Sequence, residues 1–175
     1  GVCRTGQLLA CHHESIKADI TILGKALAGG FYPVSGVLTS KNIMDVMKVG
    51  QHGSTFGGNP LACVVAKEAI KFAIENNLSQ KAHKLGLIFR NYLTDQIENL
   101  PIVKSVRGKG LLNAIVLNCH VNSEIPWNIC LSMRDNGLLA KPTQGNKIRF
   151  APPLIITEKQ LFNSLKIIIK SLKNF

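Results

Sequence analysis

Lys25 has the setting of a residue that forms a covalent bond with a carbonyl compound. It follows the apolar run at residues 20–23 and precedes a small-residue turn that ends in Gly29 and Gly30. A lysine at the dry end of a buried strand loses hydration around its ammonium, which favours the neutral amine that attacks carbonyls. This is the setting of a Schiff-base lysine. Taken alone, the position also suits a strand-end lysine that only solvates its charge.

A glycine-rich loop at residues 51–60 is the second chemical feature. Ser54 and Thr55 lie among three glycines directly before a helix N-terminus, where hydroxyls and backbone amides are exposed to an anion. An ordinary flexible loop has the same composition, and His52 has no recognisable partner and stays unassigned. Together, a carbonyl-reactive lysine and a phosphate-binding loop suggest pyridoxal 5'-phosphate. Its aldehyde would form a bond with the amine, and its phosphate would be bound by the loop.

The elements that must position these residues alternate between strands and helices. Residues 20–23 and 34–39 are rich in branched side chains and are separated by glycine and proline, a pattern typical of buried parallel strands. Asn59 and Pro60 then supply an N-cap and an N1 residue for a helix over residues 60–75.

Later elements follow an α+β pattern. Ser79 is predicted to cap a long helix that ends before Pro101. The glycines at 108 and 110 lie between two predicted strands without a following helix, which favours a tight connection over a phosphate-binding turn. Gly137 is predicted to end a helix by adopting positive φ. Strands are expected at residues 102–106, 111–117, 138–141 and 147–150, and helices at residues 127–136 and at the C-terminus.

The 175 residues hold enough apolar material for one sizeable core or two small ones, with 46% hydrophobic residues and a mean hydropathy of +0.15. The order of predicted elements changes to an α+β pattern near Asn77. This change predicts two domains, residues 1–77 and 78–175. The formal net charge is +11, but the cations are scattered and the largest group lies on one terminal helix face. Without aromatic residues interleaved among them, these cations argue against nucleic-acid binding and leave attraction to acidic substrates open.

Cysteine usage indicates the compartment. The five cysteines are odd in number and contain no C-x-x-C pair, so we expect a reduced, intracellular environment rather than a disulfide framework. Cys11, His12 and His13 are adjacent, which is the wrong spacing for a zinc site, and no metal is expected. No apolar run reaches the length of a membrane helix, so we expect a soluble chain.

Several segments resemble class III aminotransferases of pyridoxal-phosphate fold type I. The first is Leu-Gly-Lys25-Ala-Leu-Ala-Gly-Gly followed by Tyr-Pro-Val-Ser, and the second is His-Gly-Ser-Thr55-Phe-Gly-Gly-Asn-Pro. Three later segments narrow the resemblance to the ornithine aminotransferases, a family within that class. They lie at residues 106–114, 134–143 and 148–154. The resemblance implies an α/β fold: the end of a large, mainly parallel-sheet domain followed by a small α+β C-terminal domain.

The resemblance also implies roles for individual residues. Lys25 would bind the cofactor covalently and shuttle a proton between substrate and cofactor carbons. Thr55, with Ser54 beside it, would hold the cofactor phosphate, and the threonine would reach into the partner subunit's site of a homodimer. Arg149 would bind a substrate carboxylate, a task for which its planar fork is suited. Phe150 and the two prolines that follow favour a buried, positioned guanidinium over a surface ion pair.

The implied reaction transfers the δ-amino group of L-ornithine to 2-oxoglutarate. The rivals are an acetylornithine or 4-aminobutyrate aminotransferase, or a non-catalytic basic module that binds RNA or an acidic partner. The chain lacks the family's aspartate at the pyridine nitrogen and the nearby glutamine, which would precede Gly1. We therefore expect the C-terminal part of a longer enzyme, inactive alone. The cytoplasm is the favoured compartment, with the mitochondrial matrix as the alternative.

Overall fold

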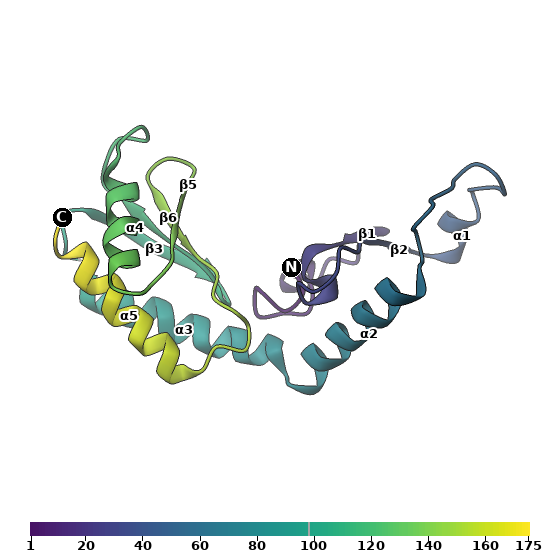
Figure 1. Ribbon diagram of the computed structural model, residues 1–175, viewed down its shortest axis with the longest axis horizontal. Helices are drawn as coiled ribbons and strands as arrows, with labels where there is room; N and C mark the ends of the chain where they lie inside the picture. Colours follow the sequence, from purple (N-terminus) through teal and green to yellow (C-terminus); the bar gives the residue numbers. More distant parts are fainter. Residues whose placement is uncertain (98) are drawn as a thin grey trace.

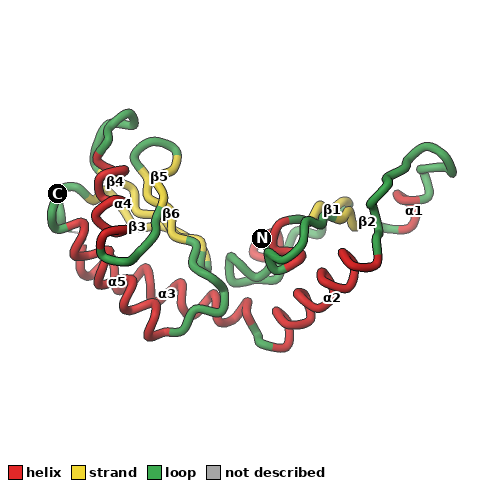
Figure 2. The backbone as a smooth tube through the Cα atoms, in the orientation of Figure 1, coloured by secondary structure: helices red, strands yellow, loops and turns green. Residues whose placement is uncertain are grey.

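The computed structural model describes residues 1–97 and 99–175 of the chain. Figure 1 shows an elongated molecule in which an N-terminal region and a C-terminal region lie on the same side of two successive helices, α2 (Pro60–Glu75) and α3 (Leu78–Ile97). Figure 2 shows that loops and turns make up most of the N-terminal region, whereas helices and strands dominate the C-terminal one. The class is α/β, as predicted.

Two short strands form the sheet of the N-terminal region. They are β1 (Ile20–Leu23) and β2 (Gly36–Thr39), and they pair antiparallel with Ile20 opposite Thr39 and Leu23 opposite Gly36. The short helices of this region are the 3₁₀ helices η1 (Ala10–Glu14) and η2 (Lys25–Ala28) and the one-turn helix α1 (Lys41–Met44).

The prediction that these two strands are parallel and buried was wrong. The connection between them contains only the single-turn helix η2, which reverses the chain and returns it antiparallel, whereas parallel neighbours need a longer crossover. Neither strand contains a buried residue, and the Ile22 side chain is 75% exposed. A run of branched residues therefore predicted the strands but not the direction of pairing or the burial.

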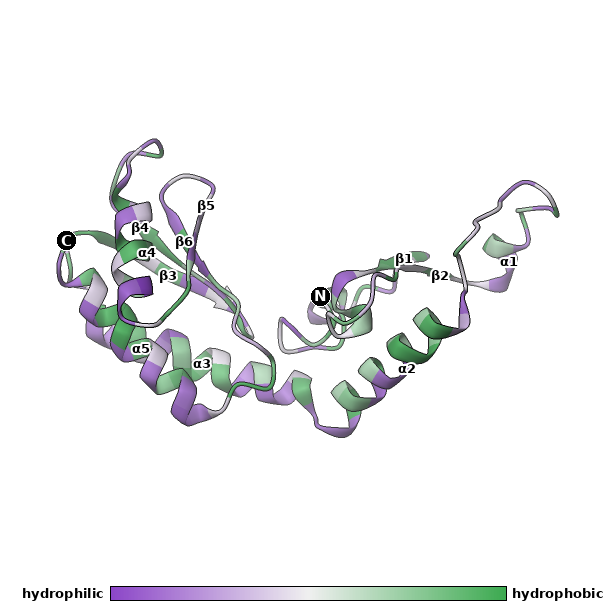
Figure 3. Cartoon of the chain, viewed as in Figure 1, coloured by the Kyte–Doolittle hydropathy of each residue, from purple (hydrophilic) through white to green (hydrophobic). Residues whose placement is uncertain are grey.

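Helix α2 has the bounds that its capping residues predict. The Asn59 Oδ1 atom accepts a hydrogen bond from the Ala62 amide at 2.9 Å, and Pro60 occupies the first turn, where no amide donor is needed. Only Ala62 and Ala73 are buried along the helix. Much of its apolar stripe is therefore exposed, and Figure 3 shows this hydrophobic side along the half of α2 nearest α1.

Helix α3 begins two residues earlier than a helix capped by Ser79 would. It starts at Leu78, so Ser79 lies in its first turn and is not the N-cap. The residue before the helix is Asn77, whose φ of 49° turns the chain sharply after α2. The Asn77 carbonyl accepts the amide of Lys81 at 3.0 Å. The asparagine, which tolerates the left-handed region, thus separates the two helices where a serine cap was predicted.

The C-terminal region is an antiparallel sheet packed against three helices. The strands lie in the order β3 (Val103–Lys109), β4 (Leu112–Leu117), β6 (Lys147–Phe150) and β5 (Lys141–Thr143). Helix α3 packs against β3, α4 (Ile125–Asp135) packs against β5 and β6, and α5 (Glu158–Leu172) packs against both helices. The predicted elements of this region are confirmed, with ends that differ by up to three residues, except that the extended piece expected at residues 138–141 shares only Lys141 with β5.

A continuous apolar core fills the space between this sheet and its helices. Phe89 of α3 and Phe150 of β6 lie with ring centroids 5.5 Å apart, and Leu165 of α5 is fully buried. Each such side chain stabilises the fold by about 1.5–3 kcal/mol relative to exposure. Cys130 lies in the same core, where burial raises the pKa of its thiol to about 11.

Two glycine predictions are confirmed. Gly137 adopts a φ of 90° just after α4, and Gly110 adopts a φ of 54° in the tight connection between β3 and β4. The lysines near the C-terminus are exposed on and just after α5, as expected for a solvated helix face. Among the described residues, every helix is too short or too polar to traverse a bilayer.

Candidate functional site

Lys25 lies at a sharp reversal of the backbone. It is the first residue of η2 and has a φ of 51°, in the left-handed region that non-glycine residues rarely adopt. Gly24 before it is extended, and the turn ends at Gly29 with a φ of 62°. Strain of this kind is found at functional sites, where the surrounding structure holds it in place.

Helix α2 supplies that support. Leu27 and Ala28 are the buried residues of η2, and η2 packs against α2. A Cβ atom at Gly29 would meet the Ala69 Cβ at 3.4 Å, so the turn passes close to the helix. The backbone on the C-terminal side of Lys25 is therefore anchored.

The Lys25 side chain is exposed, and this corrects the expectation of a dry strand end. The cause is that β1 itself is exposed, so the strand shields nothing around the amine. Within residues 1–97 and 99–175, the Lys25 ammonium has no hydrogen-bond or ion-pair partner. An anchored turn that presents a free amine fits a cofactor that is held through an aldehyde.

The predicted phosphate loop is open to solvent. Ser54 and Thr55 are both exposed, and the Ser54 Oγ accepts a hydrogen bond from the Gly57 amide at 2.9 Å. In the part of the chain that is described, the Thr55 hydroxyl forms no hydrogen bond. The Ala62 amide at the start of α2 is already used by Asn59. The Thr55 hydroxyl is therefore free to bind an anion, whereas that amide is not.

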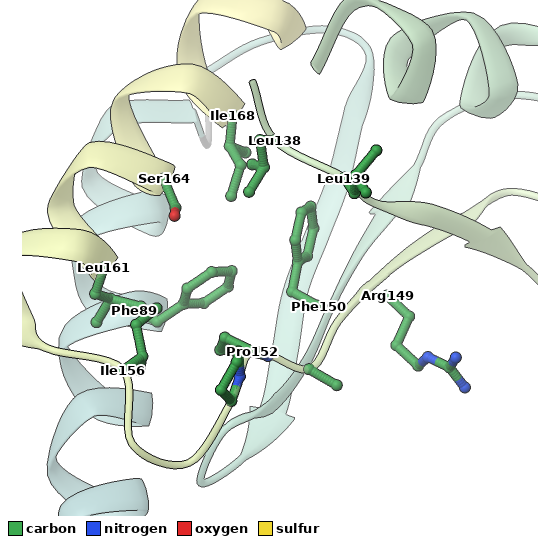
Figure 4. Close-up of a pocket in the computed structure, with 12 residues that line it drawn as sticks. Phe89, Leu138, Leu139, Arg149, Phe150, Pro152, Ile156, Leu161, Ser164 and Ile168 are labelled. Atoms are coloured by element: carbon green, nitrogen blue, oxygen red, sulfur yellow. The ribbon is translucent and has the colours of Figure 1, made fainter. Parts of the chain in front are cut away.

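Arg149 is exposed on β6, which corrects the expectation of a buried guanidinium. Side chains alternate along a strand, so Ile148 and Phe150 face the core while Arg149 between them faces outward. Figure 4 shows it leading away from an adjoining cavity of about 280 Å³ that is lined mainly by apolar side chains. The neighbouring phenylalanine and prolines therefore fix the strand, not the guanidinium.

The three predicted site features, namely Lys25, the adjacent Ser54 and Thr55, and Arg149, lie on different parts of the chain. Lys25 and Thr55 both belong to segments attached to α2, whereas Arg149 lies in the C-terminal sheet (Figure 1). In the described part of the chain, no hydrogen bond joins Lys25 to Ser54, Thr55 or Arg149. One chain thus carries the three chemical features on different elements, with no hydrogen bond between them in its described part.

Sequence reasoning missed a polar cluster where the N-terminal segment meets the β3–β4 turn. The Arg4 Nη1 atom donates to the carbonyls of Leu111 and Pro152, and Arg90 donates to the Asn113 side chain at 2.8 Å. Burial lowers the pKa of both guanidinium groups below the usual value. A signal was available, because Asn113 stands alone between Leu112 and Ala114 in a strand predicted to be apolar.

Comparisons with known proteins agree with this architecture. The profile of the class-III aminotransferases matches residues 1–172. The mitochondrial ornithine aminotransferases of Drosophila melanogaster and Rattus norvegicus are 51% and 49% identical over 98% and 100% of this chain. The chain spans 39% of the length of each of these two relatives.

Solved structures of aminotransferases also match the chain over nearly its whole length. An acetylornithine aminotransferase from Elizabethkingia anophelis superposes with a TM-score of 0.96 at 58% identity, over 100% of this chain and 44% of that one. The ornithine aminotransferase of Toxoplasma gondii gives 0.94 at 43% identity, over 99% and 41%. The fold is part of a pyridoxal-phosphate-dependent transferase of fold type I.

The chain belongs to the class-III aminotransferase family. Enzymes of this class depend on pyridoxal phosphate, and one structure of the Toxoplasma gondii enzyme reports partial occupancy of this cofactor at the active site. The resemblance read from the sequence is confirmed, as are the fold class and the cofactor. Family membership favours an enzyme over a non-catalytic basic module.

Proposed function

We propose that the full-length protein transfers the δ-amino group of L-ornithine to 2-oxoglutarate, giving glutamate 5-semialdehyde and glutamate. The observation that carries this proposal is the identity of 46–51% to ornithine aminotransferases from animals, fungi and Plasmodium over nearly the whole chain. The residues described here would form the C-terminal part of that enzyme and would be inactive alone.

Lys25 is the proposed catalytic residue. Pyridoxal phosphate supplies an aldehyde that takes up amines and a ring that accepts electrons. The Lys25 amine would hold the cofactor through that aldehyde until a substrate amine displaces it. The freed amine would then carry a proton away from the substrate's δ-carbon and deliver it to a cofactor carbon. The free, anchored position of Lys25 at the start of η2 supports both tasks.

Thr55 and Ser54 are the proposed phosphate ligands, and the site they serve is that of a partner subunit. Among the described residues, no hydrogen bond joins the exposed loop that carries them to Lys25 of the same chain, which supports a role across a homodimer interface. The Thr55 hydroxyl would donate to a phosphate oxygen. A charge-assisted hydrogen bond of this kind is stronger than a neutral one.

Arg149 is the proposed substrate-binding residue. Its outward guanidinium has no acidic partner among the described residues, so its donors are free for a carboxylate. 2-Oxoglutarate carries a carboxylate beside its reacting carbon. A bidentate contact would therefore fix that carbon for reaction.

We also propose a division near residue 77, with residues 1–77 in the large cofactor-binding domain and residues 78–175 in the small C-terminal one. The separate core beside β3–β6 supports this boundary. For the compartment we propose the cytoplasm. The mitochondrial matrix is the alternative, supported by the names of the fly and rat relatives.

Transfer from N-acetylornithine is the second candidate, because a structure 58% identical to this chain is an acetylornithine aminotransferase. The two donors differ by an acetyl group far from the reacting amine. We expect kcat/KM of the full-length protein to be at least about 10-fold higher for ornithine than for N-acetylornithine or 4-aminobutyrate. Glutamate formed from 2-oxoglutarate measures each rate. The reverse preference for either competing donor would contradict the proposed substrate.

A further inference from the structure

Arg4 joins the N-terminal segment to two strands of the C-terminal sheet. Its Nη1 atom donates to the Leu111 carbonyl at 3.2 Å and also to the Pro152 carbonyl. Leu111 directly precedes β4, and Pro152 is the second residue after the end of β6. The guanidinium is partly buried, so these bonds are shielded from competing water.

The position of Arg4 follows from the register of the two strands. The last pair of the β4–β6 ladder is Asn113 opposite Phe150, and extending the same antiparallel register by two residues places Leu111 opposite Pro152. Proline has no amide hydrogen, so it cannot donate to the Leu111 carbonyl and continue the ladder. Arg4 supplies the missing donors and bridges both carbonyls.

The backbone around Arg4 is equally constrained. The Leu111 amide donates to the Arg4 carbonyl at 3.0 Å, so the two residues are joined in both directions. A Cβ atom at Gly110 would lie 2.6 Å from that carbonyl oxygen and 2.4 Å from the Thr5 carbonyl carbon. The segment therefore fits the β3–β4 turn only because residue 110 has no side chain.

A continuous set of contacts connects this bridge to the lysine turn. Val2 and Cys3, just before Arg4, are buried with Ala73 of α2. The same helix supports η2, which begins at Lys25. At the other end of the bridge, β6 carries Arg149, which pairs with Ala114 of β4. Arg4 thus lies between the helix that positions the lysine and the strand that carries the arginine.

We propose that Arg4 is a positioning residue that holds the strand of Arg149 at a fixed place relative to Lys25. This proposal rests on the proposed function, in which Arg149 binds the carboxylate of 2-oxoglutarate. Without the bridge, the end of β6 loses its attachment to the N-terminal segment. Arg149 then holds the carboxylate of 2-oxoglutarate in the wrong place relative to Lys25. The half-reaction with ornithine depends less on that arginine.

The test compares Arg4→Met with Arg90→Met in the full-length, cofactor-loaded enzyme. Arg90 is a matched control, because it is also partly buried and donates to Gly110 and Asn113, but it makes both bonds within the C-terminal region. For Arg4→Met we expect KM for 2-oxoglutarate to rise at least about 10-fold, while the ornithine half-reaction changes by less than about 3-fold. Equal losses in both half-reactions, or the same split in Arg90→Met, would overturn the proposal.

Hydrogen exchange gives a readout that does not depend on the reaction. Amides of the peptide that contains β6 should exchange faster in Arg4→Met than in Arg90→Met, and Arg4→Lys, which keeps a donor, should restore part of the protection. If Arg4→Met does not fold, Arg4→Lys alone tests the proposal. We then expect a smaller rise in KM for 2-oxoglutarate, again without an equal change in the ornithine half-reaction. Unchanged exchange and an unchanged KM in Arg4→Lys would then refute the bridge. A wild-type enzyme that rejects ornithine would instead refute the proposed function, while faster exchange at β6 would still support the bridge.

Discussion

The C-terminal and N-terminal regions differ in how completely they cover their apolar side chains. In residues 78–175, Phe89, Leu165 and Met133 belong to one continuous core and are at most 2% exposed. In residues 1–77, the small core contains Val2, Cys3 and Ala73, whereas Phe31 is 90% exposed. Figure 3 shows hydrophobic stretches on β1 and α2, where Ile22 and Phe72 are 75% and 51% exposed.

The chemically interesting residues follow this division. Lys25 and Thr55 lie in the region with little core of its own, on a turn and a loop attached to α2. Arg149 lies on the sheet of the well-packed region and faces outward from it. The packed region thus supports the residue that we propose as a substrate contact, while the open region presents the groups that we propose for cofactor binding and for the dimer interface.

The largest effect is expected at Lys25. Replacing Lys25 with alanine removes both the covalent link and the proton carrier, so the full-length enzyme should lose about 10²–10⁴-fold or more in kcat. Borohydride reduction of the loaded enzyme followed by peptide mapping should label the peptide that holds Lys25. Lys41→Ala and Lys48→Ala serve as controls, and label on either of those lysines would refute the assignment.

The contrast in packing predicts unequal stability effects for two phenylalanines. Phe89→Ala leaves a cavity in the C-terminal core and should lower the free energy of unfolding by about 3–5 kcal/mol. Phe31→Ala in the 175-residue chain should change it by about 0.5 kcal/mol or less, because the ring is already exposed. Urea unfolding of both variants gives the two values. A large loss at Phe31 would show that the open region is packed in solution.

Thr55 tests the proposed role of the open region in binding phosphate. Thr55→Ala removes a hydrogen bond to a charged group and should weaken cofactor retention in the full-length dimer by about 1.5–3 kcal/mol. A cofactor-dialysis titration measures this retention. Thr21→Ala, on β1 and outside the loop, is the control. Retention that stays at the wild-type value in Thr55→Ala would reject this role, and a change in dimerisation alone would assign Thr55 to the interface.

Arg149 tests the role of the packed region in binding substrate. Arg149→Lys keeps the charge but loses the planar fork, and should slow the 2-oxoglutarate half-reaction by about 10–100-fold, or about 1.4–2.8 kcal/mol. The ornithine half-reaction should change less, because the δ-carbon has no adjacent carboxylate. Single-turnover spectra with each substrate separate the two steps. Equal losses in both would mean that Arg149 acts on the structure or on another carboxylate.

Local signals in the sequence were sufficient for most elements. Asn59 and Pro60 define the start of α2 because they act within one helical turn, and Gly137 ends α4 because its backbone adopts positive φ. The candidate residues were also local, since Lys25 and Thr55 were recognised from a few neighbours each. Their roles remain predictions.

The tertiary structure alone decided how these pieces meet. The antiparallel pairing of β1 with β2 depends on the path of the turn between them, and the same turn puts Lys25 at positive φ. The bridge from Arg4 reaches Leu111 and Pro152, which are separated from it in sequence by 107 and 148 positions. No local pattern encodes such a contact. The outward direction of Arg149 follows from strand alternation, but only the sheet shows which side is covered. Short-range preferences act through neighbouring backbone groups and can be read from sequence, whereas burial and long-range hydrogen bonds exist only once the chain has folded.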